Sequence, residues 1–354
     1  MTPLASLLIE RISQNGPLTI AEFMADCLLH PEHGYYATRD PFGARGDFTT
    51  APEISQMFGE LIGLCLAQSW LDQGSPAPFL LVEIGPGRGT LMADILRATC
   101  SVPGLHAAAK IHLIEASPTL RERQRETLSE YTVDWHDTIS TLPDAPLFLV
   151  ANEFFDALPI RQFIRSGNGW RERRVGIEKG QLVLGAGEAV PVPGLNHRLS
   201  DTKEGDLVEN CAAAAAITSE IANRIGRNCG AALIVDYGDW RSLGDTLQAL
   251  KNHAVDPVLA NPGDADLTAH VDFEALASAA QSAGVTKMTP QGVLLERLGI
   301  TGRAQIIAKN LSGDALKSHI AAHRRLTHPQ EMGTLFKAIS IYPKGCKPPP
   351  GFDL

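Results

Sequence analysis

The 354-residue sequence lacks the hydrophobic run of about 18 to 20 residues that a membrane-spanning helix requires. Its first apolar stretch is interrupted by Glu10 and Arg11, so it does not resemble a signal peptide. The same stretch is not rich in Arg and Ser, as a mitochondrial transit peptide would be. We therefore expect no membrane insertion and a cytoplasmic location.

Runs of basic residues and paired cysteines are also absent. The net charge is −9, which works against nonspecific binding to nucleic acid, because such binding depends on basic surface. None of the six cysteines forms a C-x-x-C pair, which argues against zinc-ribbon and thioredoxin-like sites and is typical of reduced thiols. No Cys/His spacing typical of a metal site occurs. We expect neither a nucleic-acid partner nor a bound metal.

What the sequence does contain is an alternation of apolar strands with helices. The stretches that we interpret as strands include FLLVEIG, KIHLIEAS, YTVDWHD, LFLVANEFF, AALIVDYG and AQIIAKN. Such alternation predicts a parallel sheet with helices on both faces. Between about Arg161 and Gly187 the pattern changes to short antiparallel strands with glycine turns. The prediction is an α/β protein with a doubly wound, Rossmann-like sheet.

The predicted additions to this sheet are an N-terminal helical extension, a β insertion and a C-terminal helical tail. The expected boundaries are 1–75 for the N-terminal helices and a lid, 76–160 and 206–312 for the two halves of the sheet domain, 161–205 for the β insertion and 313–354 for the tail. We expect the β insertion to dock the substrate.

The stretch VEIGPGRGTLMADIL passes from a strand through three close glycines into a helix. The third of them, Gly89, stands one residue closer to Gly85 than in the dinucleotide fingerprint, and no phosphate-loop lysine follows. Glu83 is unfavourable beside a pyrophosphate but suits an ammonium group, and the helix N-terminus suits a carboxylate. S-adenosylmethionine carries both groups and no phosphate, so we predict this cofactor. A dinucleotide site or a glycine turn without a ligand is the alternative.

Two more acidic residues follow neighbouring strands. Glu115 ends the second strand, where a carboxylate can accept both hydroxyls of a ribose. Asp137 follows the third strand, where it is placed for the amino group of an adenine or for capping the next helix. Because the strand ends of an open α/β sheet face one crevice, we expect both residues to lie near the glycine loop.

The loop after the fourth strand, NEFFDALP, supplies Glu153 and Asp156. An arginine side chain stays protonated at neutral pH, so an enzyme that methylates it needs carboxylates to hold and orient the guanidinium group. We predict that Glu153 binds this group and that Asp156 is a second partner or a turn cap. Asn152 is expected at the cofactor, and it leaves methylation of an amino group open.

Seven stretches together resemble the MidA-like family, whose mitochondrial members act in respiratory complex I assembly as S-adenosylmethionine-dependent protein arginine methyltransferases. They run in order along nearly the whole chain: HGYYATRDPFGARGDFTTAPEISQMFGE, EIGPGRGTLMADILR, IEASPTLRERQ, NEFFDALPIRQF, DYGDWRSLGDTLQALKNH, DLTAHVDF and LTHPQEMGTLFK. The resemblance implies a class I methyltransferase fold.

It also implies roles for particular residues. The cofactor would rest on Gly85, Gly87 and Gly89, with Glu115 on the ribose and Asp137 near the adenine. The segment GDFTTAPEIS would close over it, and the candidates for contact are Thr50, Pro52 and Glu53.

The implied partner is a protein substrate, such as a subunit of the NADH–quinone oxidoreductase. The lack of a targeting extension suggests a bacterial, cytoplasmic member of the family. A non-catalytic assembly chaperone with the same fold and a small-molecule methyltransferase remain the alternatives, and a homodimer is left open.

Overall fold

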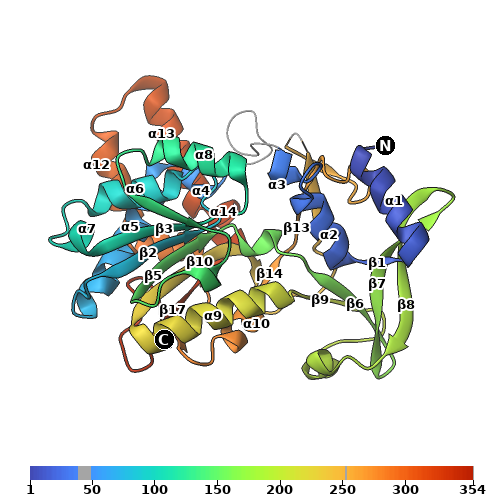
Figure 1. Cartoon of the computed structure of the whole chain (residues 1–354). Coiled ribbons are helices and arrows are strands. Elements are labelled where there is room, and N and C mark those ends of the chain that lie inside the picture. Colours follow the sequence, from blue (N-terminus) through green and yellow to red (C-terminus); the bar gives the residue numbers. More distant parts are fainter. Residues whose placement is uncertain (39–48, 252, 354) are drawn as a thin grey trace.

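A computed structural model describes residues 1–38, 49–251 and 253–353, and its largest sheet, which is mixed, lies on the left in Figure 1. Its strand order is β15-β17-β10-β5-β2-β3-β4. The strands β2 (Phe79–Ile84), β3 (Ala109–Ile114), β4 (Val133–His136), β5 (Leu147–Asn152) and β10 (Gly230–Asp239) are mutually parallel. The chain moves outward from β2 through β3 to β4 and then returns to β5, which lies on the other side of β2. This reversal opens a crevice at the carboxyl ends of β2 and β5.

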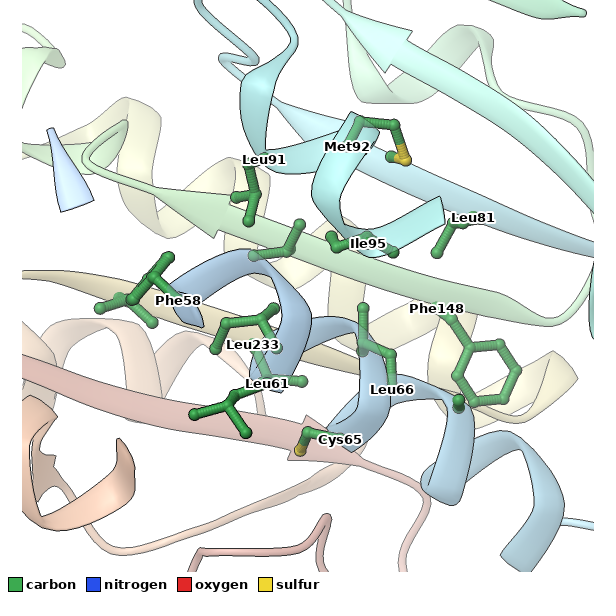
Figure 2. Close-up of a cluster of buried hydrophobic side chains, with 14 of the residues drawn as sticks. Phe58, Leu61, Cys65, Leu66, Leu81, Leu91, Met92, Ile95, Phe148 and Leu233 are labelled. Carbon is green, nitrogen blue, oxygen red and sulfur yellow. The ribbon is translucent and has the colours of Figure 1, made fainter. Parts of the chain in front are cut away.

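Helices cover both faces of this sheet, as the alternation of strands and helices predicts. On one face Leu81, Phe148 and Leu233 pack with α5 (Gln56–Asp72) and α6 (Thr90–Thr99), as Figure 2 shows. On the other face Leu80 and Leu149 pack with α9 (Ala212–Asn228) and α10 (Phe273–Ala279). Neighbouring strand residues face opposite sides because the side-chain period of a strand is two. The near-continuous apolar runs of the sequence are therefore explained by burial on both faces.

The predicted β insertion is a separate antiparallel sheet beside the N-terminal helices (Figure 1). Its strands are β6 (Arg161–Ser166), β7 (Gly169–Glu178), β8 (Gln181–Val190) and, beyond the predicted end at residue 205, β9 (Leu207–Asn210), and β1 (Leu18–Thr19) pairs with β7. The helices α1 (Pro3–Asn15) and α2 (Ile20–Leu29) share an apolar cluster with this sheet. A capping box between Thr19 and Glu22 fixes the start of α2.

Shorter elements complete the chain. The helices are α3 (Tyr35–Thr38), α4 (Ala51–Ile54), α7 (Leu105–Ala108), α8 (Pro118–Thr127), α11 (Gln291–Arg297), α12 (Ile300–Ala308), α13 (Gly313–Thr327) and α14 (Met332–Leu335), with 3-10 turns η1 (Ile139–Thr141), η2 (Phe155–Ala157) and η3 (Pro193–Leu199). The strands are β11 (Gln248–Lys251), β12 (Ala254–Asp256), β13 (Asp266–Thr268), β14 (Val271–Asp272), β15 (Gly284–Val285), β16 (Thr289–Pro290) and β17 (Phe336–Tyr342).

The C-terminal part differs from the prediction in two elements. The stretch AQIIAKN, which we predicted to be a strand, lies mainly in the helix α12, so that prediction is wrong. Ile300, Ala304 and Ile307 recur at helical spacing on the buried side, whereas Ile306 is 56% exposed. The position beside β10 in the sheet is occupied instead by the antiparallel strand β17, which follows the helices α13 and α14. The stretch 313–354, which we predicted to be a helical tail, is therefore helical only in part.

None of the helices in the described part of the chain is long and apolar enough to cross a membrane.

Candidate active site

The glycine loop joins β2 to α6 at the carboxyl edge of the sheet. Gly85, Gly87 and Gly89 all have left-handed φ angles, of 66°, 53° and 83°, which a residue with a Cβ adopts only under strain. The loop closes through a hydrogen bond of 2.7 Å from the Gly89 N–H to the Pro86 carbonyl. Gly89 is the N-cap of α6 and has no side chain with which to cap it. The start of α6 can therefore offer backbone N–H groups to an anion.

Glu83 lies beneath this loop and is only 3% exposed. The pKa of its carboxyl is raised to about 8, mainly by burial and also by the nearby carboxylates of Glu115 and Asp94, while a hydrogen bond from the Met92 N–H opposes the rise. Its Oε2 atom is buried and has no hydrogen-bond partner among the described residues. A buried carboxyl oxygen without a partner fits an ammonium group, which is the cation that S-adenosylmethionine would present here.

A pocket opens between the glycine loop, α4 and the end of β5. Seven of the predicted residues line it: Thr50, Pro52, Glu83, Gly85, Gly87, Asn152 and Glu153. The predicted lid residue Glu53 also lines the pocket, and its Oε1 accepts a hydrogen bond of 2.6 Å from the Thr90 hydroxyl of α6. The start of the GDFTTAPEIS segment, before Thr49, lies outside the described residues.

Glu115 and Asp137 lie at the same sheet edge but do not line this pocket. Glu115 is partly buried, which raises the pKa of its carboxyl, and it accepts hydrogen bonds from the Ser117 N–H at 2.7 Å and the Gln124 amide at 3.3 Å. Asp137 has an 81% exposed side chain that forms a 2.6 Å ion pair with Arg121.

Gln124 connects Glu115, the predicted ribose ligand, to the glycine loop. Its role was not predicted from the sequence. This fully buried amide donates at 2.8 Å to the Gly87 carbonyl and at 3.3 Å to Glu115. It also accepts a hydrogen bond of 2.8 Å from the Trp135 indole. A polar residue on the apolar side of an otherwise charged helix is the only local signal that could have identified it.

The NEFFDALP loop brings Glu153 to the edge of the pocket. Glu153 has a φ of 52°, a left-handed conformation that costs a non-glycine residue about 1–2 kcal/mol. Its Oε1 accepts hydrogen bonds from the Ala51 N–H at 2.9 Å and from the Asn152 amide at 3.1 Å. The pKa of this carboxyl is raised to about 7, mainly by burial and also by the nearby Asp156 carboxylate, while the hydrogen bonds from Ala51 and Asn152 oppose the rise.

Asp156 is more deeply buried than Glu153, and Tyr237 and Asp236 of β10 lie next to it. Burial raises the pKa of its carboxyl, while a hydrogen bond from the Tyr237 hydroxyl opposes that rise. The neighbouring Asp236 of β10 is fully buried, and its pKa is raised by burial and by the carboxylates of Asp156 and Glu153. Asp236 was not predicted, although one acidic residue in the apolar run AALIVDYG is a signal that sequence reasoning could have used.

Three carboxyl groups thus lie together beside the pocket, and two tyrosines stand near them. Tyr36 of α3 is close enough to Asp156 for that charge to raise the pKa of its phenol, and its hydroxyl is hydrogen-bonded to Asp266. Such a cluster favours a cation, because a positive group offsets the cost of burying the carboxylates. A guanidinium group has the charge and the planar set of donors that carboxylates bind in pairs.

Replacement of Gly85 by Ala is expected to weaken cofactor binding by at least about tenfold, a loss of about 1.4 kcal/mol. The added Cβ would lie 2.9 Å from Cδ2 of Phe154, at a backbone φ of 66°. Gly74→Ala is the matched control, since Gly74 has a φ of 83° and no atom within 4 Å of the added Cβ. Calorimetric titration with S-adenosylmethionine measures both variants, and equal affinities would contradict the role of Gly85.

Comparison with known proteins points to the same chemistry. A family model described as "Putative S-adenosyl-L-methionine-dependent methyltransferase" matches residues 61–291. The mitochondrial protein arginine methyltransferase NDUFAF7 of Xenopus tropicalis is 35% identical, and the match covers 95% of this chain and 85% of the relative. Its human counterpart is 34% identical, over 97% of this chain and 84% of the relative.

A crystal structure from Burkholderia thailandensis has a similar fold throughout. That protein, bound to S-adenosylhomocysteine, superposes with a TM-score of 0.83 at 29% identity, and the match covers 98% of this chain and 93% of that chain. The extent of the match agrees with the class I methyltransferase fold expected from the sequence.

The expected cytoplasmic location requires correction. The curated relatives of frog and man are named as mitochondrial proteins, and this contradicts an assignment to the cytoplasm. The composition of the N-terminal stretch was therefore not a sufficient basis for that expectation.

The glycine loop, the buried acidic residue beneath it and a match along nearly the full length agree, and the chain belongs to this family of S-adenosyl-L-methionine-dependent methyltransferases.

Proposed function

We propose that this protein transfers a methyl group from S-adenosylmethionine to an arginine side chain of a protein substrate. The observation that carries the proposal is the position of Glu153, which lines the cofactor pocket on one side and neighbours Asp156 and Asp236 on the other. The relatives named as protein arginine methyltransferases support the choice of substrate class.

In this proposal, residues at the carboxyl ends of β2 and β5 and in the loops that follow them hold the cofactor. Glu83 would pair with the ammonium group, and the start of α6 with the carboxylate. The glycines Gly85, Gly87 and Gly89 would allow close approach of the backbone. Thr50, Pro52 and Asn152, which line the pocket together with Gly85 and Gly87, would also contact the cofactor. Glu115 would bind the ribose, and Asp137 would receive the adenine amino group.

The cofactor supplies a methyl group that its sulfonium already activates, so the protein mainly orients the acceptor nitrogen and excludes water. Glu153 would accept two N–H groups of the guanidinium and aim one nitrogen at the cofactor pocket. Asp156 would stabilise the remaining positive charge. The proton that leaves the methylated nitrogen would pass to Glu153, whose raised pKa suits a base near neutral pH.

We further propose that the substrate is a subunit of the NADH–quinone oxidoreductase and that the β insertion docks it. The strand β6 begins five residues after Asp156, so the β insertion directly follows the NEFFDALP loop. Light scattering of the purified protein decides between a monomer and a homodimer.

Mass spectrometry of quinone-oxidoreductase subunits should show methylarginine in cells that contain this protein and unmodified arginine when its gene is deleted. Restoring the wild-type gene should restore the mark. An unchanged arginine pattern would contradict the proposed substrate, and a methylated small molecule in its place would indicate a different acceptor.

Replacement of Glu153 by Gln should lower kcat by about 100-fold or more, because the guanidinium loses its charged partner. Affinity for S-adenosylmethionine should stay within a few-fold, since an amide oxygen can still accept the Ala51 N–H. Transfer of labelled methyl groups and calorimetry measure the two effects separately. Glu126→Gln, on the exposed side of α8, is the control. Full activity of the Glu153 variant would refute its assignment.

The rate should depend on pH in a definite direction. Because the pKa of Glu153 is raised to about 7, its carboxyl is protonated below that pH and cannot bind the guanidinium as a carboxylate. The value of kcat/KM should therefore rise as pH increases through about 7, and the Glu153→Gln variant should not show this rise. A profile that is flat between about pH 6 and 8 in the wild type would be inconsistent with the proposal.

A further inference from the structure

Asp236 lies below the NEFFDALP loop, on the strand β10 that neighbours β5. Val235 is paired in register with Asn152, and the Glu153 N–H donates to the Val235 carbonyl at 2.9 Å. The next residue, Asp236, is completely buried and occupies the side of β10 that also carries Ala232 and Ile234. Its side chain therefore meets the loop where it leaves the sheet.

One oxygen of Asp236 accepts hydrogen bonds from three consecutive backbone groups. Its Oδ2 lies 3.2 Å from the Phe154 nitrogen, 2.9 Å from that of Phe155 and 3.3 Å from that of Asp156. Its Oδ1 accepts the N–H of Tyr237 at 2.9 Å. Three successive N–H groups converge on one atom only if the backbone curls around it, so residues 154–156 curve around the Asp236 carboxylate.

This arrangement explains two unfavourable features of the loop. Glu153 holds a left-handed φ, and three carboxyl groups lie close together in a buried region. Neither would persist unless the surrounding structure imposed it. The same loop also lies next to the glycine loop. A Cβ added to Gly85 would come within 2.9 Å of the Phe154 ring.

We propose that Asp236 is a positioning residue that holds Glu153 and Asp156 in the orientation required for the substrate. The catalytic part of this proposal rests on the proposed function, since it assumes that these two carboxylates bind the guanidinium. Its structural part, that Asp236 sets the shape of residues 153–156, stands independently.

The test compares Asp236→Ala with Asp236→Asn in the full-length protein. The alanine variant leaves the N–H groups of residues 154–156 without their acceptor, so hydrogen exchange at these amides should quicken by about tenfold or more. Its kcat for arginine methylation should fall by about 100-fold, with affinity for S-adenosylmethionine within a few-fold of the wild type. The asparagine variant keeps an oxygen for the three donors, and it should restore slow exchange and most of kcat.

Asp272→Ala is the matched control for loss of a largely buried aspartate. Asp272 accepts the N–H groups of Ala275 at 2.9 Å and Ser242 at 3.4 Å, and it lies outside the pocket. This variant should lose thermal stability to a similar extent but keep kcat within about twofold and slow exchange at residues 154–156.

Unchanged exchange at residues 154–156 in Asp236→Ala would overturn the whole proposal, and fast exchange with wild-type kcat would overturn its catalytic part. If the alanine variant does not fold, the asparagine variant decides: slow exchange at residues 154–156 together with most of the wild-type kcat is expected, and slow exchange with a kcat about 100-fold lower would contradict positioning through these hydrogen bonds. If the wild type methylates no arginine, the proposed function fails by itself, and exchange alone then decides whether Asp236 shapes the loop.

Discussion

The parallel pairing of β2 with β5 is the constraint on which the rest of the site depends. The two strands are separated in sequence by β3 and β4, yet their register places Glu83 beside Val150 and Ile84 beside Ala151. The glycine loop and the NEFFDALP loop therefore leave the sheet side by side, as expected at the reversal of strand order. A shift of this register by one residue would place Glu83 and Asn152 on opposite faces of the sheet.

Burial of acidic groups gives this site its chemical character. Glu83 on β2 and Glu153 after β5 both have raised pKa values because burial disfavours their charged forms. Each could be stabilised by a cation from the ligands, an ammonium group in one case and a guanidinium group in the other. The proposed reaction thus brings two cations to two carboxyl groups that otherwise bear the cost of desolvation. Asp236 adds to that cost, and its four backbone hydrogen bonds are the compensation.

The parts of the fold predicted from sequence are those with local signals. Alternating apolar strands and helices predicted the sheet, and the spacing of Gly85, Gly87 and Gly89 predicted the loop that joins β2 to α6. The helix α12 was mistaken for a strand because a short apolar run does not reveal its period. The role of Asp236 could not be derived in detail, since its partners lie about 80 residues earlier in the chain. Only tertiary structure brings such groups together.

A crystal structure of this protein with S-adenosylmethionine or its demethylated product would test the central claim most directly. We predict that the ammonium group contacts Glu83 and that the sulfur atom faces the side of the pocket formed by Glu153. The position of the cofactor relative to these two residues decides whether the acidic cluster can receive a methyl acceptor. A sulfur atom directed away from Glu153 and Asp156, with the ammonium group distant from Glu83, would contradict the account.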